Sequence, residues 1–396
     1  MVTFDQDGFF AVFPWNPQRG WGGTEQHEQG LESIAACNFT IGGFIQTEDL
    51  PACEATGMSA LYYDPVFCHR AQPAWNSLSQ AEIDEVIRGW MANGGDSPSV
   101  YGFYIYDEPG ATAFPGLARA VDAVRRLAPN KLAYINLFPN YATMGGEDSQ
   151  LQTETYEEHL ERFVQEVRPQ VLSWDNYMPQ YSDDGRDVAQ MTLYYTNLVQ
   201  MRAVAQRHGL PYWQTVSPSR IFPRSAVPTP ANLAFQAWTS LAAGCSSVAW
   251  YCYYDHGMRF SPVDDQERRN LTWYWLAEVN RQLALVGPLL KAMRSTGLYF
   301  TTTNLTEPVP APPEPLASAV SAEQPLMLGT FKDADGACCC VVVNLDLDRT
   351  AKVTLAFPRP VQELSLTGAG WMERDEKEPL CLAPGQGGVL RVAESC

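Results

Sequence analysis

The chain has 396 residues, of which 45% are hydrophobic and 18% are charged, and its formal net charge at pH 7 is −18. That length and composition predict a globular protein with one large domain and a smaller one. The negative charge argues against a nucleic-acid partner, because phosphate backbones are bound by clustered Lys and Arg. No stretch approaches the roughly 20 apolar residues that a membrane helix needs, and the first residues do not form a secretory signal.

Ten cysteines are present, three of them in the run Cys338-Cys339-Cys340. Neighbours on a strand point to opposite faces, so these three cannot easily all find bridging partners. We therefore expect mostly reduced thiols and a cytoplasmic location. No Cys-x-x-Cys pair occurs, and the five histidines show no i, i+4 pair. No metal site is expected, and no cofactor is implied.

Eight apolar segments, each followed by a helical pattern, occupy the chain up to about Met293. Helix starts are marked by capping-box patterns at Ser79 and Thr155. Eight such units match a closed eight-stranded barrel of roughly 250 residues. An open doubly wound sheet is the alternative, but the glycine-rich turn expected after its first strand is missing. The predicted strands are 9–15, 39–45, 58–63, 100–106, 131–138, 171–178, 211–216 and 246–254.

The composition changes after a long predicted helix at 267–293. Residues 307–315 are a proline-rich excursion, and short alternating runs separated by turn residues follow it. These runs predict an antiparallel sandwich, with strands at 326–331, 337–345, 351–357, 361–366 and 385–392. The predicted fold is thus a (β/α)8 TIM barrel over residues 1–296 and a small C-terminal β-sandwich over residues 297–396.

Two adjacent carboxylates, Asp107 and Glu108, close the fourth predicted strand and are followed by Pro109. Barrels of this kind keep their chemistry at the C-terminal ends of their strands. Side-chain alternation places Glu108 on the same face as Tyr106, and it turns Asp175 of the sixth strand inward as well. Cleavage of a glycosidic bond needs one protonated and one ionised carboxyl group. We therefore expect Glu108, with a pKa raised by burial, as general acid/base, and Asp175 or Asp107 as the second carboxylate.

Structural roles compete with these assignments. A carboxylate before a proline can cap a helix or pair with an arginine, and Asp-Asn is also loop-forming. Aromatic side chains at strand ends can stack on sugar rings, although tryptophan on a barrel strand also fills the core. The candidate substrate-binding residues are Trp15, Tyr106, Asn136, Tyr177, Trp213, Gln214, Trp250, Tyr253 and Asp255.

Several blocks resemble the clan-A-like barrel glycoside hydrolases of bacteria. They are Gly-Phe-Tyr-Ile-Tyr-Asp-Glu-Pro at 102–109, Tyr-Ile-Asn at 134–136, Leu-Ser-Trp-Asp-Asn-Tyr at 172–177 and an aromatic-rich stretch at 243–254. Residues 382–391 are similar to the closing strand of the β-sandwich that such enzymes often carry. The resemblance implies a hydrolase acting on O-glycosidic bonds of a carbohydrate substrate.

One position departs from that family. Its retaining members carry a glutamate nucleophile on strand seven, whereas this chain has Gln214 there. Asp175 could then be the nucleophile or the water-activating base. Alternatively, Asp107 and Glu108 resemble the adjacent pair of hexosaminidase-type enzymes, in which the substrate's acetamido group attacks and the aspartate orients it. Tyr177 would then donate a hydrogen bond to that group. A barrel that binds glycan without turnover is a third reading, and a metal-dependent hydrolase would need clustered ligands that the sequence lacks.

Overall fold

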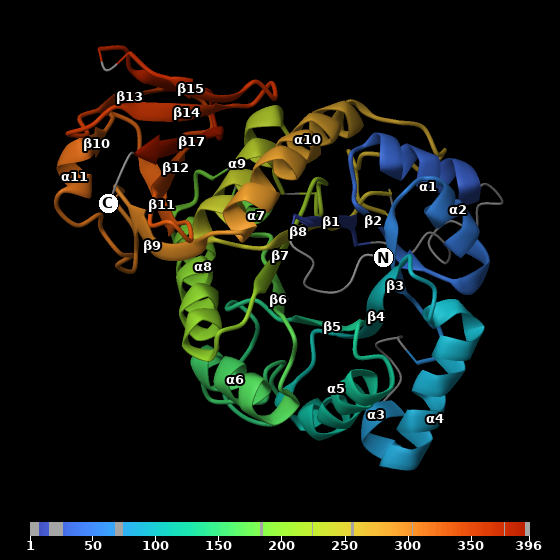
Figure 1. The fold of residues 1–396 in the computed structure, drawn as a ribbon. Helices are drawn as coiled ribbons and strands as arrows, with labels where there is room; N and C mark the ends of the chain where they lie inside the picture. The colour runs from blue at the N-terminus through green and yellow to red at the C-terminus, as the bar shows by residue number, and fades with distance from the viewer. Residues whose placement is uncertain are drawn as a thin grey trace.

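The structure is a computed structural model that describes residues 8–15, 27–67, 74–182, 185–223, 225–254, 257–302, 304–375 and 377–392. A ring of parallel strands surrounded by helices is followed by antiparallel sheets at the C-terminus (Figure 1). This arrangement confirms the predicted fold class, a TIM barrel with a β-sandwich.

All eight predicted barrel strands form, and they pair in parallel in the order β1-β8-β7-β6-β5-β4-β3-β2. The ring closes between β1 and β2 through Thr40. Its N–H donates to the Val12 carbonyl oxygen (2.9 Å), and its Oγ1 accepts from the Val12 N–H (2.8 Å). The strands are β1 (Ala11–Pro14), β2 (Ile41–Ile45), β3 (Ser59–Tyr62), β4 (Val100–Asp107), β5 (Leu132–Leu137), β6 (Leu172–Asp175), β7 (Tyr212–Val216) and β8 (Ser247–Trp250).

The helices begin where the capping residues predict. Ser79 forms a complete capping box with Glu82. Thr155 accepts from the Glu158 N–H, but the Glu158 carboxylate accepts from the Glu154 N–H, so this second box is only half formed. The barrel helices are α1 (His27–Ala36), α2 (Leu50–Ala55), α3 (Ala74–Ser77), α4 (Gln80–Trp90), α5 (Phe114–Leu127), α6 (Tyr156–Arg162), α7 (Met178–Tyr181), α8 (Val188–His208), α9 (Pro230–Ala243) and α10 (Leu271–Lys291), with shorter helical turns at Thr47–Asp49, Met91–Gly95, Ala111–Ala113 and Phe163–Val167.

Aromatic rings fill the inside of the barrel. The centroid of the Tyr134 ring lies 5.7 Å from that of Phe13 and 5.6 Å from that of Trp213, so side chains from β5, β1 and β7 meet at the barrel axis. Phe44 and Tyr104, from β2 and β4, are 4.4 Å apart between ring centroids. The interior is therefore a packed core rather than a pore.

The second domain consists of a six-stranded antiparallel sheet and a three-stranded sheet. Leu328, Val342 and Leu390 lie in the apolar core of this domain. The six-stranded sheet includes β9, which starts at 294, just before the predicted domain boundary. The elements are β9 (Arg294–Phe300), α11 (Leu316–Ala319), β10 (Val320–Ser321), β11 (Leu326–Lys332), β12 (Cys338–Asn344), β13 (Ala351–Leu355), β14 (Val361–Ser365), β15 (Gly370–Glu373), β16 (Leu380–Leu382) and β17 (Gly387–Val392).

Helix α9 packs directly on the six-stranded sheet, and two glycines allow the close approach. A Cβ atom on Gly329 of β11 would lie 2.1 Å from the Ala242 carbonyl oxygen, and one on Gly387 of β17 would lie 2.3 Å from the Trp238 ring. Only glycine fits where backbone meets a helix this closely. The sheet is thereby fixed against the barrel helix that follows β7.

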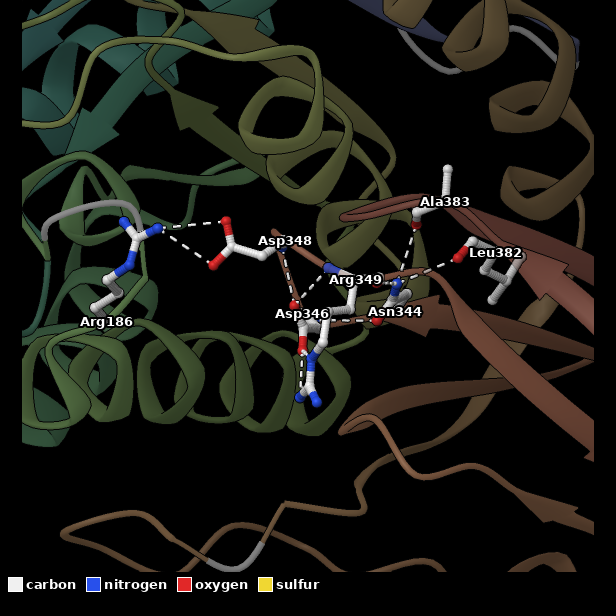
Figure 2. A network of polar contacts seen from close by, with 7 residues as sticks. All are labelled: Arg186, Asn344, Asp346, Asp348, Arg349, Leu382 and Ala383. Carbon is white, nitrogen blue, oxygen red and sulfur yellow. Dashed lines mark hydrogen bonds and ion pairs between the residues drawn. The ribbon is translucent and has the colours of Figure 1, made fainter.

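A second contact joins the domains at the turn between β12 and β13 (Figure 2). Asp346 folds this turn by accepting from the N–H groups of Asp348 and Arg349. The turn presents the Asp348 carboxylate to Arg186, at 3.2 Å, in the segment between α7 and α8. Both side chains are more than half exposed, so the pair adds little to stability. The Arg186–Asp348 pair marks one place where the sandwich contacts the segment that follows β6.

Because His159 on α6 is buried, we expect the stability of the protein to depend on pH. The side chain is fully buried and lies 5.1 Å from the Phe114 ring, and burial lowers the pKa of its imidazole to about 4. An unfolded chain would bind the same proton near pH 6.5. The stability that His159 contributes is therefore complete above pH 6.5 and is lost as the pH falls through 4, by about 3 kcal/mol in all.

Urea unfolding at several pH values checks this expectation. We expect His159→Gln to flatten the dependence of the unfolding free energy between pH 6.5 and 4. His208→Gln is the matched control, because His208 is a partly exposed histidine on α8. A wild-type slope in His159→Gln would show that another group causes the acid instability.

Candidate active site

Strand β4 carries an irregularity just before its acids. It pairs with β5 as Tyr104↔Tyr134, and the register then shifts so that Asp107 lies opposite Asn136. Such an irregularity changes which side chains face inward. The predicted alternation, which turned Glu108 inward together with Tyr106, is therefore wrong beyond Tyr104. Asp107, not Glu108, continues the inward face of the strand.

Glu108 itself leaves the strand conformation. Its φ is +47°, in the left-handed region, and its N–H donates to the Asn136 carbonyl oxygen at 2.8 Å. A non-glycine residue with positive φ is uncommon and is often associated with functional sites. The strand ends at Asp107, before Pro109, as the sequence predicts. Glu108 thus lies at the barrel mouth, half-buried.

Asn136 links the two aspartates. Its Nδ2 donates to Asp107 Oδ1 at 3.2 Å and to Asp175 Oδ1 at 2.9 Å. Asn136 and Asp175 are almost completely buried, with 1% and 2% of their surfaces exposed. An amide nitrogen carries two hydrogens, so one can go to each carboxylate. The carboxylates of Asp107 on β4 and Asp175 on β6 are therefore close together, because both bind the same nitrogen atom on β5.

A chain of hydroxyl groups fixes the orientation of this amide. Ser173 Oγ donates to Asn136 Oδ1 at 3.1 Å and lies 3.0 Å from the Tyr134 hydroxyl. Because the serine has only one hydrogen, Tyr134 is the donor in the second bond. Burial raises the pKa of Tyr134, so the phenol keeps this proton. The amide oxygen is thus occupied, and its nitrogen faces the acids.

Three tyrosines surround Asp175. The Tyr177 ring lies 5.6 Å from that of Tyr251, and the Tyr141 hydroxyl accepts from the Tyr177 N–H at 3.2 Å. Burial, with a further contribution from the Asp175 carboxylate, raises the pKa of Tyr141 and of Tyr177. Burial also raises the pKa of Tyr251. All three are neutral phenols at pH 7 and can donate hydrogen bonds. Only Tyr177 was among the predicted site residues.

Gln214 faces away from the barrel mouth. Its Oε1 accepts from Ser240 Oγ on α9 at 2.7 Å, and 1% of the residue is exposed. The alternation along β7 turns the neighbouring Trp213 inward, where its ring packs 5.6 Å from Tyr134. The residue found where the resembling family keeps its nucleophile therefore packs against a helix and not against the acids.

The other predicted aromatic residues differ in where they point. Trp15 is nearly buried at the inner wall, with its ring 5.0 Å from Phe44. Trp250 is fully buried and donates to Asn280 on α10. Tyr253 is also buried, and its hydroxyl lies 2.9 Å from Trp273 Nε1. Trp250 and Tyr253 thus pack toward α10.

Tyr106 is half-buried near the end of β4, beside the acids. Asp255 lies outside the described residues.

The cysteines among the described residues form no disulfide bonds. Within these ranges there is no cluster of three His, Cys, Asp or Glu side chains that could hold a metal ion. None of the helices described is both long enough and apolar enough to span a bilayer.

No protein-family model and no curated protein matches the sequence. Solved structures are similar in fold. The E323A catalytic mutant of Gan42B, a GH42 β-galactosidase from G. stearothermophilus, has a TM-score of 0.68 at 8% identity, covering 99% of both chains. A β-galactosidase from Marinomonas ef1 has a TM-score of 0.53 at 8% sequence identity, and the match covers 72% of this chain and 62% of that one. The exo-β-1,4-mannosidase Op5Man5 from Opitutaceae bacterium strain TAV5 has a TM-score of 0.50 at 14% sequence identity, and the match covers 72% of this chain and 63% of that one.

These neighbours are glycoside hydrolases. This chain spans less than two thirds of the length of the last two, and at such identities the likeness establishes the fold.

Proposed function

We propose that this protein is a glycoside hydrolase that cleaves O-glycosidic bonds of an oligo- or polysaccharide by carboxylate catalysis. Glu108 is the general acid/base, and Asp175 or Asp107 is the second carboxylate. The observation that carries the proposal is the convergence of Asp107 and Asp175 at the C-terminal ends of β4 and β6, where the Asn136 side chain joins them and where the Glu108 N–H donates to the Asn136 carbonyl oxygen. That end is where barrels of this fold keep their chemistry, and the similar solved structures are glycoside hydrolases.

The chemistry needs a proton donor for the leaving oxygen and a carboxylate for the anomeric carbon. Glu108 supplies the proton, and one of the two aspartates faces the developing positive charge. Asn136 is a positioning residue, because it holds both aspartates without carrying charge. The neutral phenols of Tyr177, Tyr141 and Tyr251 donate hydrogen bonds to sugar hydroxyls, and these bonds orient the ring for attack.

The second carboxylate does not come from strand seven. β7 reads Tyr-Trp-Gln-Thr-Val, and its Gln214 faces α9. This favours two mechanisms. In the first, Asp175 or Asp107 acts directly as nucleophile or base. In the second, Asp107 orients an acetamido group of the substrate, which then attacks while Tyr177 donates to it. The nearness of Tyr177 to both carboxylates supports this role, and burial, with contributions from Asp175 and Asp107, raises the pKa of its phenol, which keeps the proton it would donate.

A product assay tests the proposal. The wild-type protein is incubated with a panel of neutral, acidic and N-acetylated oligosaccharides, and new reducing ends are measured. We expect release of product from at least one class, and release from N-acetylated substrates alone would select the acetamido mechanism. Binding of glycans without product from any of them would contradict the proposal and identify a carbohydrate-binding barrel without turnover.

A further inference from the structure

A cavity of about 260 Å³ lies beside the proposed active site, between the segments that follow β7 and β8. It is lined by Arg220, Ile221, Phe222, Pro223, Gly257 and Arg259. Its volume is slightly below the roughly 300–1,000 Å³ of typical ligand sites. A space of this size suits one sugar residue or its substituent rather than a length of chain.

Two arginines on paired backbone segments line this cavity. The Arg220 N–H donates to the Arg259 carbonyl oxygen (2.8 Å), and the Arg259 N–H donates to the Arg220 carbonyl oxygen (3.2 Å), as in an antiparallel pair. Directly opposed side chains lie close on the same face, and like charges placed in this way are destabilising. Neither guanidinium forms an ion pair with a carboxylate among the described residues. An anion between them would offset the repulsion.

The two guanidinium groups are held differently. Arg220 donates from Nε to the Ser225 carbonyl oxygen (3.0 Å) and from its terminal nitrogen to the Pro223 carbonyl oxygen, so its plane is fixed by the backbone. Arg259 is exposed, and among the described residues no partner binds its guanidinium. One preorganised and one adjustable guanidinium are suited to a planar or tetrahedral anion.

A row of aromatic rings connects the cavity with the acids. Phe222, which lines the cavity, stacks on Tyr181 at 5.5 Å with an interplanar angle of 27°. The ring centroid of Tyr181 lies 6.5 Å from that of Tyr177, and the ring centroid of Tyr177 lies 5.6 Å from that of Tyr251. Sugar rings bind on aromatic faces of this kind. A glycan cleaved near Asp175 and lying along this row would therefore place a neighbouring residue at the arginines.

We propose that this cavity is a subsite for an anionic sugar residue, carrying a carboxylate or a sulfate group, and that the substrate is an acidic glycan. The inference rests on the proposed function. The chain carries a net charge of −18, which repels a polyanion at long range. A local pair of arginines would therefore be needed to hold such a substrate. Phe222, with 57% of its surface exposed, would then stack on the sugar that carries the anion.

Binding measurements test the subsite without any turnover. D-Glucuronate, D-glucose 6-sulfate and D-glucose are titrated into the full chain at low ionic strength by ligand-observed NMR. We expect the anionic sugars to bind at least tenfold more tightly than glucose, because a hydrogen bond to a charged group is worth about a tenfold or larger factor in affinity. Preference for glucuronate identifies a uronic acid residue, and preference for the sulfate identifies a sulfated one.

Two variants assign the effect to the pocket. Arg259→Gln should weaken binding of the preferred anionic sugar about tenfold or more, and Arg259→Lys should lose less because it retains the charge. Arg281→Gln, which removes a surface arginine paired with Glu278 on α10, is the control and should leave binding unchanged. Equal affinities for the three sugars, or wild-type affinity in a folded Arg259→Gln variant, would overturn the inference.

The product assay separates the two proposals. Hydrolysis of neutral glycans without preference for acidic ones would contradict the anionic subsite and leave the hydrolase assignment standing. Binding of glucuronate or the sulfated sugar that depends on Arg259, without product from any glycan, would support the subsite and contradict the hydrolase assignment.

Discussion

Replacing Glu108 by glutamine is expected to lower kcat for glycoside hydrolysis by about 10²–10⁴-fold, the contribution typical of a general acid. The amide has the shape of the acid but cannot transfer the proton. The main-chain conformation at this position should survive, because glutamine meets the same constraint at φ +47° as glutamate does. The melting temperature should therefore stay close to that of the wild type.

Kinetics on two aryl glycosides of the cleaved sugar measure this effect. A poor leaving group needs protonation and a good one does not, so the loss in Glu108→Gln should be largest with the poor leaving group. Glu147→Gln, an exposed glutamate in the segment after β5, is the matched control and should retain wild-type kinetics. Full activity of Glu108→Gln on the poor substrate would remove Glu108 from the mechanism.

Replacing Asn136 by leucine is expected to lower both activity and stability. The leucine fills a similar volume but leaves Asp107, Asp175 and Ser173 without their shared partner. Each of the lost hydrogen bonds is worth about 1–3 kcal/mol, so we expect a loss of about 2–5 kcal/mol in the free energy of unfolding. We also expect kcat to fall at least about 10²-fold, because catalytic groups displaced by about 1 Å lose that much.

Asn140→Leu separates the two effects of this change. Asn140 is also a buried amide shortly after β5, and it donates to the Leu193 carbonyl oxygen at 3.0 Å. Among the described residues, its hydrogen bonds are to groups on α8 and not to the acids. We expect Asn140→Leu to lose stability, measured by urea unfolding, while retaining kcat. Equal losses of kcat in both variants would show that Asn136 acts only through stability.

The barrel strands could be predicted because each is buried on both faces. Such strands appear in a sequence as short continuous apolar runs, and the ends of β4 and β6 followed directly. The register shift between Tyr104 and Tyr106 could not be predicted, because nothing in the sequence marks it. One extra residue reverses the assignment of inward and outward faces, which is why Asp107 and not Tyr106 lies opposite Asn136.

Aromatic residues at strand ends were harder to place. Trp213, near the start of β7, faces the barrel axis, whereas Trp250, at the end of β8, faces α10. The alternation of side chains along β8 could have distinguished the outward-facing Trp250 from the inward-facing Trp213. The concentration of aromatic rings at one end of the barrel could not. Tyr141, Tyr181 and Phe222 were missed for another reason. They lie outside the strands, where no periodicity indicates a shared surface.

The most direct measurement is a crystal structure of Glu108→Gln with an oligosaccharide substrate bound. We expect the scissile glycosidic oxygen to lie within about 2.6–3.2 Å of the side chain at position 108. The anomeric carbon should face Asp175 or Asp107. A sugar bound only on the C-terminal sheets, or one in the barrel mouth with that side chain turned away from the glycosidic oxygen, would contradict this expectation.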